Sequence, residues 1–191
     1  MSAGALLSAA NIGMMRGERV LFRDVSLTLS PGEAIILRGA NGAGKTTLLR
    51  ILAGLTRAET GELNRPAPQH WVAHRDGLKP HETPRDHLRL WAQAWGQTAD
   101  IDTLLAEMGL SRPADVPAKH LSAGQRRRTA LARLRLETRP VWLLDEPFTA
   151  LDADGTALLG DMIAEHRRQG GGLVAAIHGE AGFEFDMQVT V

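Results

Sequence analysis

A glycine-rich segment at residues 39–46 constrains the fold of this 191-residue chain more than any other feature. It has the form G-x-x-x-x-G-K-[ST], follows an apolar run at 34–37 and precedes a stretch at 47–53 with the apolar spacing of a helix. In this context glycines leave backbone N–H groups free to face phosphate oxygens, and the helix N-terminus adds partial positive charge. The segment predicts a phosphate-binding loop. A glycine-rich turn without a ligand is the alternative, which the flanking strand and helix disfavour.

Two side chains of the loop carry specific expectations. Lys45 is expected to reach the β- and γ-phosphates of a nucleotide, and Thr46 to offer its hydroxyl to Mg²⁺. The predicted nucleotide-binding residues of this segment are Gly39, Ala40, Asn41, Gly42, Ala43, Gly44, Lys45, Thr46 and Thr47.

The remaining apolar segments predict an α/β fold with a mainly parallel sheet. Buried strands are expected at 34–37, 141–144 and 173–177, because unbroken apolar runs that alternate with helices are typical of a sheet covered on both faces. The other expected elements are strands at 5–12, 19–30 and 71–73, a turn at 60–63 that leads into a short strand, helices from Thr83, at 100–108 and at 152–169, and a loop at 112–119.

These elements suggest how the chain is organised. The two early strands predict an antiparallel sheet laid against the nucleotide-binding core. We expect one domain over 1–191, with a core formed by 1–75 and 139–191 and an inserted helical subdomain at 76–138.

Three polar residues follow the predicted parallel strands. Asp145 and Glu146 end one strand and His178 ends another, so they are expected at the same sheet edge as the phosphate loop. Asp145 is expected to hold Mg²⁺ opposite Thr46. Glu146 is expected to polarise an attacking water, since neighbours on an extended chain point apart. An acidic strand end before a turn is the alternative.

Composition excludes several classes of function. The net charge is zero and the pI is about 7.1, so no nucleic acid partner is expected. The chain has no cysteine, which excludes disulfides and thiolate metal sites. No run approaches 18 apolar residues, so a membrane role requires a partner. Direct haem or metal binding is not expected from the scattered histidines His70, His74, His81 and His87.

Residues 121–125, Leu-Ser-Ala-Gly-Gln, resemble the L-S-G-G-Q signature of the ATP-binding subunits of ABC transporters. The resemblance covers nearly the whole chain and implies a P-loop ATPase that uses ATP and Mg²⁺. It implies that Lys45, Glu146 and the switch histidine His178 serve catalysis. It also implies a head-to-tail dimer, in which the signature residues Ser122, Ala123, Gly124 and Gln125 contact the γ-phosphate held by a second copy.

The resemblance gives Asp152 the place of the family's D-loop aspartate, which links the two sites of the dimer. An N-cap of the following helix is the structural alternative, and both roles are compatible. The signature likewise has a structural alternative, a Ser/Gly helix cap before residues 126–128.

Two positions depart from the family pattern. His74 stands where the family usually has glutamine, nine residues before Thr83, and is kept as a candidate contact to water or metal. The family usually stacks an aromatic ring on adenine, but residues 14–17 contain none. Arg16 could stack through its guanidinium plane, or Met15 could pack there instead.

Softer similarities indicate one branch of the family. Residues 16–22, 48–55 and 77–79 resemble ATPases of cytochrome c biogenesis. This implies separately encoded integral membrane subunits, a location at the cytoplasmic face of the bacterial inner membrane, and a role in haem export or in release of a haem-loaded chaperone. Another ABC transporter or a soluble ABC-type iron–sulfur assembly ATPase are the alternatives.

Overall fold

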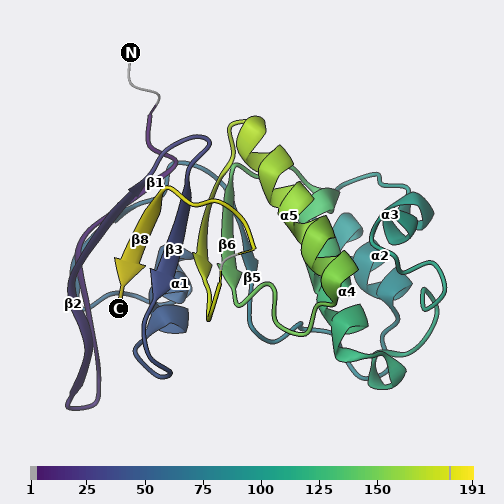
Figure 1. Ribbon diagram of the computed structural model, residues 1–191, viewed down its shortest axis with the longest axis horizontal. Coiled ribbons are helices and arrows are strands. Elements are labelled where there is room, and N and C mark those ends of the chain that lie inside the picture. The colour runs from purple at the N-terminus through teal and green to yellow at the C-terminus, as the bar shows by residue number, and fades with distance from the viewer. Residues whose placement is uncertain (1–3, 181) are drawn as a thin grey trace. The chain divides into compact units, whose positions relative to one another are not determined.

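The computed structural model describes residues 4–180 and 182–191 (Figure 1). The chain divides into two compact units. The first contains Met1–Trp71, Arg139–Glu146 and Met162–Val191, and the second contains Val72–Thr138 and Pro147–Asp161. No helix within the described residues is both long and apolar enough to cross a membrane.

An antiparallel sheet in the first unit is formed by β1 (Leu7–Arg16), β2 (Arg19–Leu29) and β4 (Thr60–Asn64), in the order β2-β1-β4. The prediction of two early antiparallel strands is confirmed. The predicted turn at 60–63 is wrong, because these residues pair with β1 as a strand. Gly61 permits this pairing, since a Cβ there would lie 2.4 Å from the carbonyl oxygens of Ala10 and Asn11.

The second sheet is formed by β5 (Gln69–Val72), β6 (Val141–Asp145), β7 (Gly172–Ala176), β3 (Ala34–Arg38) and β8 (Met187–Thr190), in that spatial order. Strands β6, β7, β3 and β8 pair in parallel. Every residue of β6 and β7 is buried, as their apolar runs predict, and the burial includes Asp145 at the end of β6. The edge strand β8 was not predicted, because Met187, Gln188 and Thr190 are exposed or polar.

The core of the first unit lies around helix α1 (Lys45–Leu52) and the two sheets. Leu48, Leu49, Ile51 and Leu52 are at most 1% exposed and pack with apolar residues of the antiparallel sheet and of β3, β6 and β7. This burial anchors α1 beneath the phosphate loop, so the loop is held at both ends by fixed elements.

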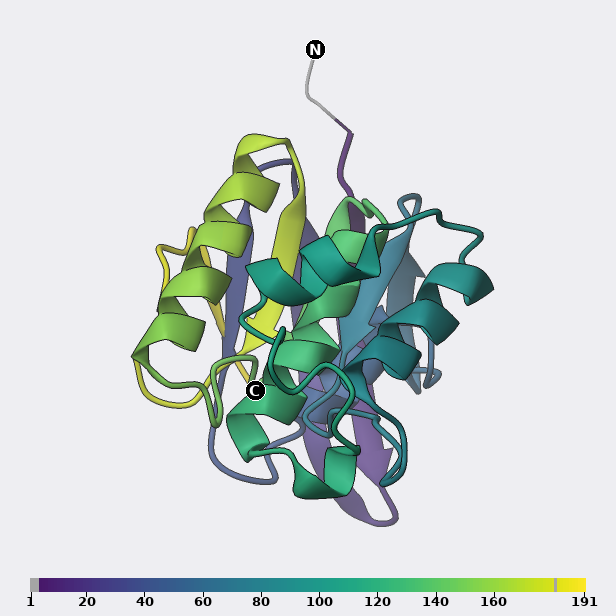
Figure 2. The ribbon, with the colours of Figure 1, turned by 90° about the vertical axis from the view of Figure 1, so that its right-hand side faces the viewer.

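The second unit contains α2 (Pro84–Ala94), α3 (Ile101–Glu107), the 3₁₀ helix η1 (Ala118–His120) and α4 (Ala123–Leu136), which Figure 2 shows in teal to green. Thr83 caps α2 in a reciprocal capping box with Asp86, as its sequence predicts. Helix α5 (Ala153–Arg168) begins in this unit and ends in the first.

Candidate functional site

The phosphate loop joins the end of β3 to the start of α1. Gly39, Gly42 and Gly44 all have positive φ, a backbone conformation that residues other than glycine rarely adopt. At Gly44 the glycine is also required by space, because a Cβ would lie 2.8 Å from the Phe22 ring. The loop therefore turns tightly into α1, with the helix N-terminus at its mouth.

Lys45 is 6% exposed and points into the loop that carries it. Its Nζ donates hydrogen bonds to the carbonyl oxygens of Gly39 at 2.8 Å and Ala40 at 3.0 Å. The ammonium group is therefore placed at the centre of the loop, where a phosphate chain would lie.

Thr46, the residue after Lys45, contacts Asp145. The Thr46 hydroxyl donates to Asp145 Oδ2 at 2.8 Å, and Asp145 is 2% exposed at the end of β6. These are hard oxygen donors of the kind that Mg²⁺ prefers, so the pair fits a magnesium ion.

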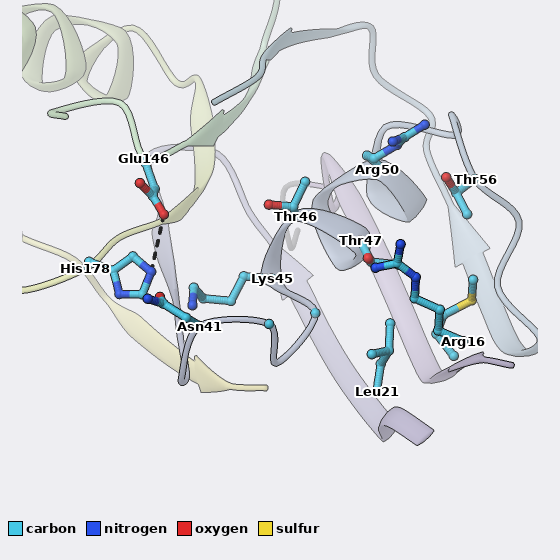
Figure 3. A pocket seen from close by; sticks show the side chains of 13 residues that line it. Arg16, Leu21, Asn41, Lys45, Thr46, Thr47, Arg50, Thr56, Glu146 and His178 are labelled. Carbon is cyan, nitrogen blue, oxygen red and sulfur yellow. Dashed lines mark ion pairs between the residues drawn. The ribbon is translucent and has the colours of Figure 1, made fainter. Parts of the chain in front are cut away.

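Glu146 and His178 form the opposite side of the site. His178 Nε2 lies 3.2 Å from Glu146 Oε1, and Figure 3 draws this pair beside Lys45 and Asn41. We expected Glu146 to face away from Asp145 because the chain would be extended there. That reason is wrong: Glu146 has φ of +49°, and its N–H donates to the Ala176 carbonyl at 2.9 Å. A left-handed turn, rather than strand alternation, aims the carboxylate.

A cavity of about 720 Å³ in the first unit connects these groups. This volume suits a ligand of nucleotide size. Phosphate-loop residues, Glu146 and His178 line one side of it, and Arg16, Leu21, Arg50 and Thr56 lie on the other side (Figure 3). Met14 also lines the cavity.

Sequence reasoning was incomplete for the side of the cavity that contains Arg16. Arg16 lines it as expected, whereas Met15 is not among the lining residues. Met14, Leu21, Arg50 and Thr56 were missed. Met14 was predictable because it lies two residues before Arg16 on β1, and residues i and i+2 of a strand share a face. Arg50 was predictable because it lies one helical turn after Thr46 and Thr47.

The signature residues lie in the second unit, at the start of α4. The Ser122 hydroxyl accepts a hydrogen bond from the Gln125 N–H at 3.1 Å, and Gln125 Oε1 accepts one from the Ser122 N–H at 2.9 Å. A Cβ on Gly124 would lie 2.9 Å from the Ala150 carbonyl oxygen. Ala123 is exposed. The signature segment is thus a capped helix start, and its residue Gly124 must be small.

Asp152 caps α5 and carries an ion pair within the second unit. Its Oδ1 accepts from the Gly155 N–H at 2.9 Å, and Arg128 Nη2 donates to both carboxylate oxygens, at 3.0 and 2.7 Å. The structural alternative for Asp152 is therefore present in the fold. His74 is exposed in the same unit. Within the described ranges, no three His, Cys, Asp or Glu side chains gather into a metal-binding group.

Comparison with known proteins gives a consistent result. Residues 22–149 match the family described as ABC transporter. The whole chain is 61% identical to the cytochrome c biogenesis ATP-binding export protein CcmA of Hyphomonas neptunium and covers 99% of it. It is 44% identical to the protein of that name from Methylococcus capsulatus, over 91% of each chain.

A solved structure agrees with the fold. The ATP-binding subunit of an ABC transporter matches with a TM-score of 0.81 and 25% identity, over 91% of this chain and 79% of that one.

Proposed function

This chain belongs to the ABC transporter family and is an ATPase of that family, and on this premise we propose that it powers a membrane complex of cytochrome c biogenesis. The observation that carries the proposal is the identity of 61% over the full length of a protein named for that process. The complex would export haem or release a haem-loaded chaperone.

The proposed site chemistry rests on the convergence of the phosphate loop with Glu146 and His178 around one cavity. The loop N–H groups and Lys45 bind the β- and γ-phosphates of ATP. Glu146 orients a water and takes its proton as the water oxygen attacks the γ-phosphorus and the bond to the bridging oxygen of ADP breaks. His178 holds the Glu146 carboxylate in place.

Thr46 and Asp145 are the residues that would hold Mg²⁺, because their oxygens already lie 2.8 Å apart at the loop. The ion would supply positive charge that offsets the charge developing on the phosphate oxygens. We propose that His74 contacts water or metal and that Arg16 packs on the adenine base of ATP.

We also propose that two copies work together head to tail. In this arrangement Ser122, Ala123, Gly124 and Gln125 of each copy face the γ-phosphate bound by the other. The start of α4 supports this role, since the partial positive charge of a helix N-terminus attracts phosphate. Asp152 would lie near the same interface, and separately encoded membrane subunits would hold the pair at the cytoplasmic face of the inner membrane.

The hydrolytic role of Glu146 is tested by Glu146→Gln. We expect turnover to fall by at least about 100-fold, because the amide cannot accept a proton, while ATP affinity stays within about threefold. Steady-state phosphate release and equilibrium ATP binding measure the two quantities. Glu62→Gln, an exposed change on β4, is the matched control. Wild-type turnover in Glu146→Gln would remove this residue from the mechanism.

The biological role is tested by pull-down of tagged Glu146→Gln from solubilised membranes, with and without ATP. Recovery of haem-handling integral membrane subunits, identified by mass, is the expected result. Recovery of other membrane subunits would assign the ATPase to a different ABC transporter. Recovery of soluble iron–sulfur proteins alone would overturn the transporter assignment.

A further inference from the structure

Arg38 is an arginine that the proposed mechanism does not use, although it lies directly before the phosphate loop. It is the last residue of β3, and its side chain is only partly exposed. Its Nη1 donates to the carbonyl oxygen of Ile177 at 3.2 Å and also to that of Gly179. One guanidinium group therefore holds the backbone on both sides of His178.

The other end of this link is fixed by the sheet. Arg38 pairs with Thr190 of β8, and its carbonyl accepts from the Val191 N–H at 2.8 Å. The preceding residue, Leu37, pairs with Ala176 of β7. The Cα of Arg38 is thus held rigidly next to Gly39, where the phosphate loop begins.

After Ile177, whose N–H donates to the Leu37 carbonyl at 3.3 Å, the segment that Arg38 holds is exposed. It follows the last residue of β7 and has no regular secondary structure from 177 to 180. Gly179 has φ of +73°, and a Cβ there would meet no atom within 4 Å, so neighbouring side chains do not confine it. A guanidinium with fixed donor geometry is well suited to restrict such a segment.

We infer that Arg38 is a positioning residue, which fixes His178 against Glu146 and keeps both in register with the phosphate loop. The inference rests on the proposed role of Glu146 and His178 in ATP hydrolysis. Arg38 itself lines none of the cavity described above. Its loss should therefore lower turnover through His178 and leave nucleotide binding nearly intact.

The test compares Arg38→Ala with Arg167→Ala in the full chain. Arg167 is a matched control because it also donates to two backbone carbonyls of the first unit, those of Gly32 and Glu184. We expect Arg38→Ala to lower kcat by about 10- to 100-fold, because small misplacements of a catalytic group have effects of that size. The KM for ATP should change by less than about threefold, and Arg38→Lys should recover part of the loss.

A double-mutant cycle with His178→Ala makes the test specific. If Arg38 acts through His178, Arg38→Ala should add less than about a twofold loss in the His178→Ala background. Equal losses in both backgrounds, wild-type turnover in Arg38→Ala, or an equal loss in Arg167→Ala would each overturn the inference. Wild-type turnover in both His178→Ala and Glu146→Gln would instead overturn the proposed function on which it rests.

Discussion

At the scale of single residues, the most informative observation is the backbone of Glu146. A non-glycine residue with φ of +49° costs free energy, about 1 kcal/mol. The surrounding fold maintains it through the hydrogen bond to Ala176, and the result is a carboxylate that faces His178. Strain of this kind is common where a side chain must be aimed, so it independently supports a functional role for Glu146.

Lys45 gives a prediction at the same scale. Lys45→Ala removes the ammonium at the centre of the loop, and a charge-assisted bond to phosphate is worth about 1.5–3 kcal/mol. We expect ATP affinity to fall by about 10- to 100-fold. Equilibrium binding of ATP measures this, with Lys79→Ala, an exposed lysine of the second unit, as the control. Unchanged affinity in Lys45→Ala would contradict the placement of phosphate in the loop.

Sequence reasoning brought together the residues whose positions follow from spacing along the chain. The loop motif led directly to Lys45 and Thr46, and the strand ends led to Asp145, Glu146 and His178. It failed where a role depends on distant backbone. Nothing in the local sequence shows that Arg38 reaches the carbonyls at 177 and 179, because Ile177 lies 139 positions after Arg38.

At the scale of elements, the end of α5 is packed against β6 by an aromatic pair. The rings of His166 and Trp142 stack with centroids 3.9 Å apart and planes 8° from parallel. Gly171 must be small here, since a Cβ would lie 2.1 Å from the His166 ring. Burial lowers the pKa of His166 below its ordinary 6.5, with the carbonyls of Gly172 and Pro140 opposing this shift. The packing therefore favours neutral imidazole.

A pH dependence of stability follows from this depressed pKa. Below about pH 6.5 the unfolded chain binds a proton that folded His166 resists, so the free energy of unfolding falls by up to about 1.4 kcal/mol per pH unit until the folded pKa is reached. His166→Phe keeps a stacking ring and should reduce this slope. Part of the slope should remain in this variant, because burial also lowers the pKa of His87.

Urea unfolding at several pH values between 7.5 and 5.5 measures the slope. His81→Phe is the control, because His81 is exposed. A slope in His166→Phe equal to that of the wild type would show that His166 does not contribute.

Elements were predictable to different degrees for a physical reason. Strands β3, β6 and β7 contain apolar runs and were found, since burial on both faces imposes that composition. Their only charged residues, Arg38 of β3 and Asp145 of β6, lie at the ends of the strands. The strands β4 and β8 were misjudged because they are short and mostly exposed. Their backbone pairing, rather than their side chains, makes them strands.

At the scale of the whole molecule, the residues proposed for one reaction lie in two units of the chain. The phosphate loop, Glu146 and His178 belong to the first unit, and the signature helix belongs to the second. A head-to-tail pair would supply each phosphate loop with a signature helix from the other copy. Dimerisation is then part of the active site, not an addition to it.

This arrangement is tested by changing charge without changing the helix cap. Aspartate and asparagine cap helices about as well as serine. In the Glu146→Gln background with ATP, Ser122→Asp should abolish dimers in gel filtration, because its carboxylate would face a γ-phosphate. Ser122→Asn should preserve them. A dimer that persists in Ser122→Asp would show that the signature does not face phosphate.

The internal hydrogen bonds of Lys45 have a consequence for the end of each catalytic cycle. When a product leaves a site that contains a nearly buried ammonium group, that cation would ordinarily be stranded without acceptors, at a cost of a few kcal/mol. Here the carbonyls of Gly39 and Ala40 stand ready to accept from it. In the proposed site, departure of ADP would exchange the bonds from Lys45 to phosphate for bonds to these carbonyls. A loop with these internal acceptors could bind ATP tightly and still release ADP.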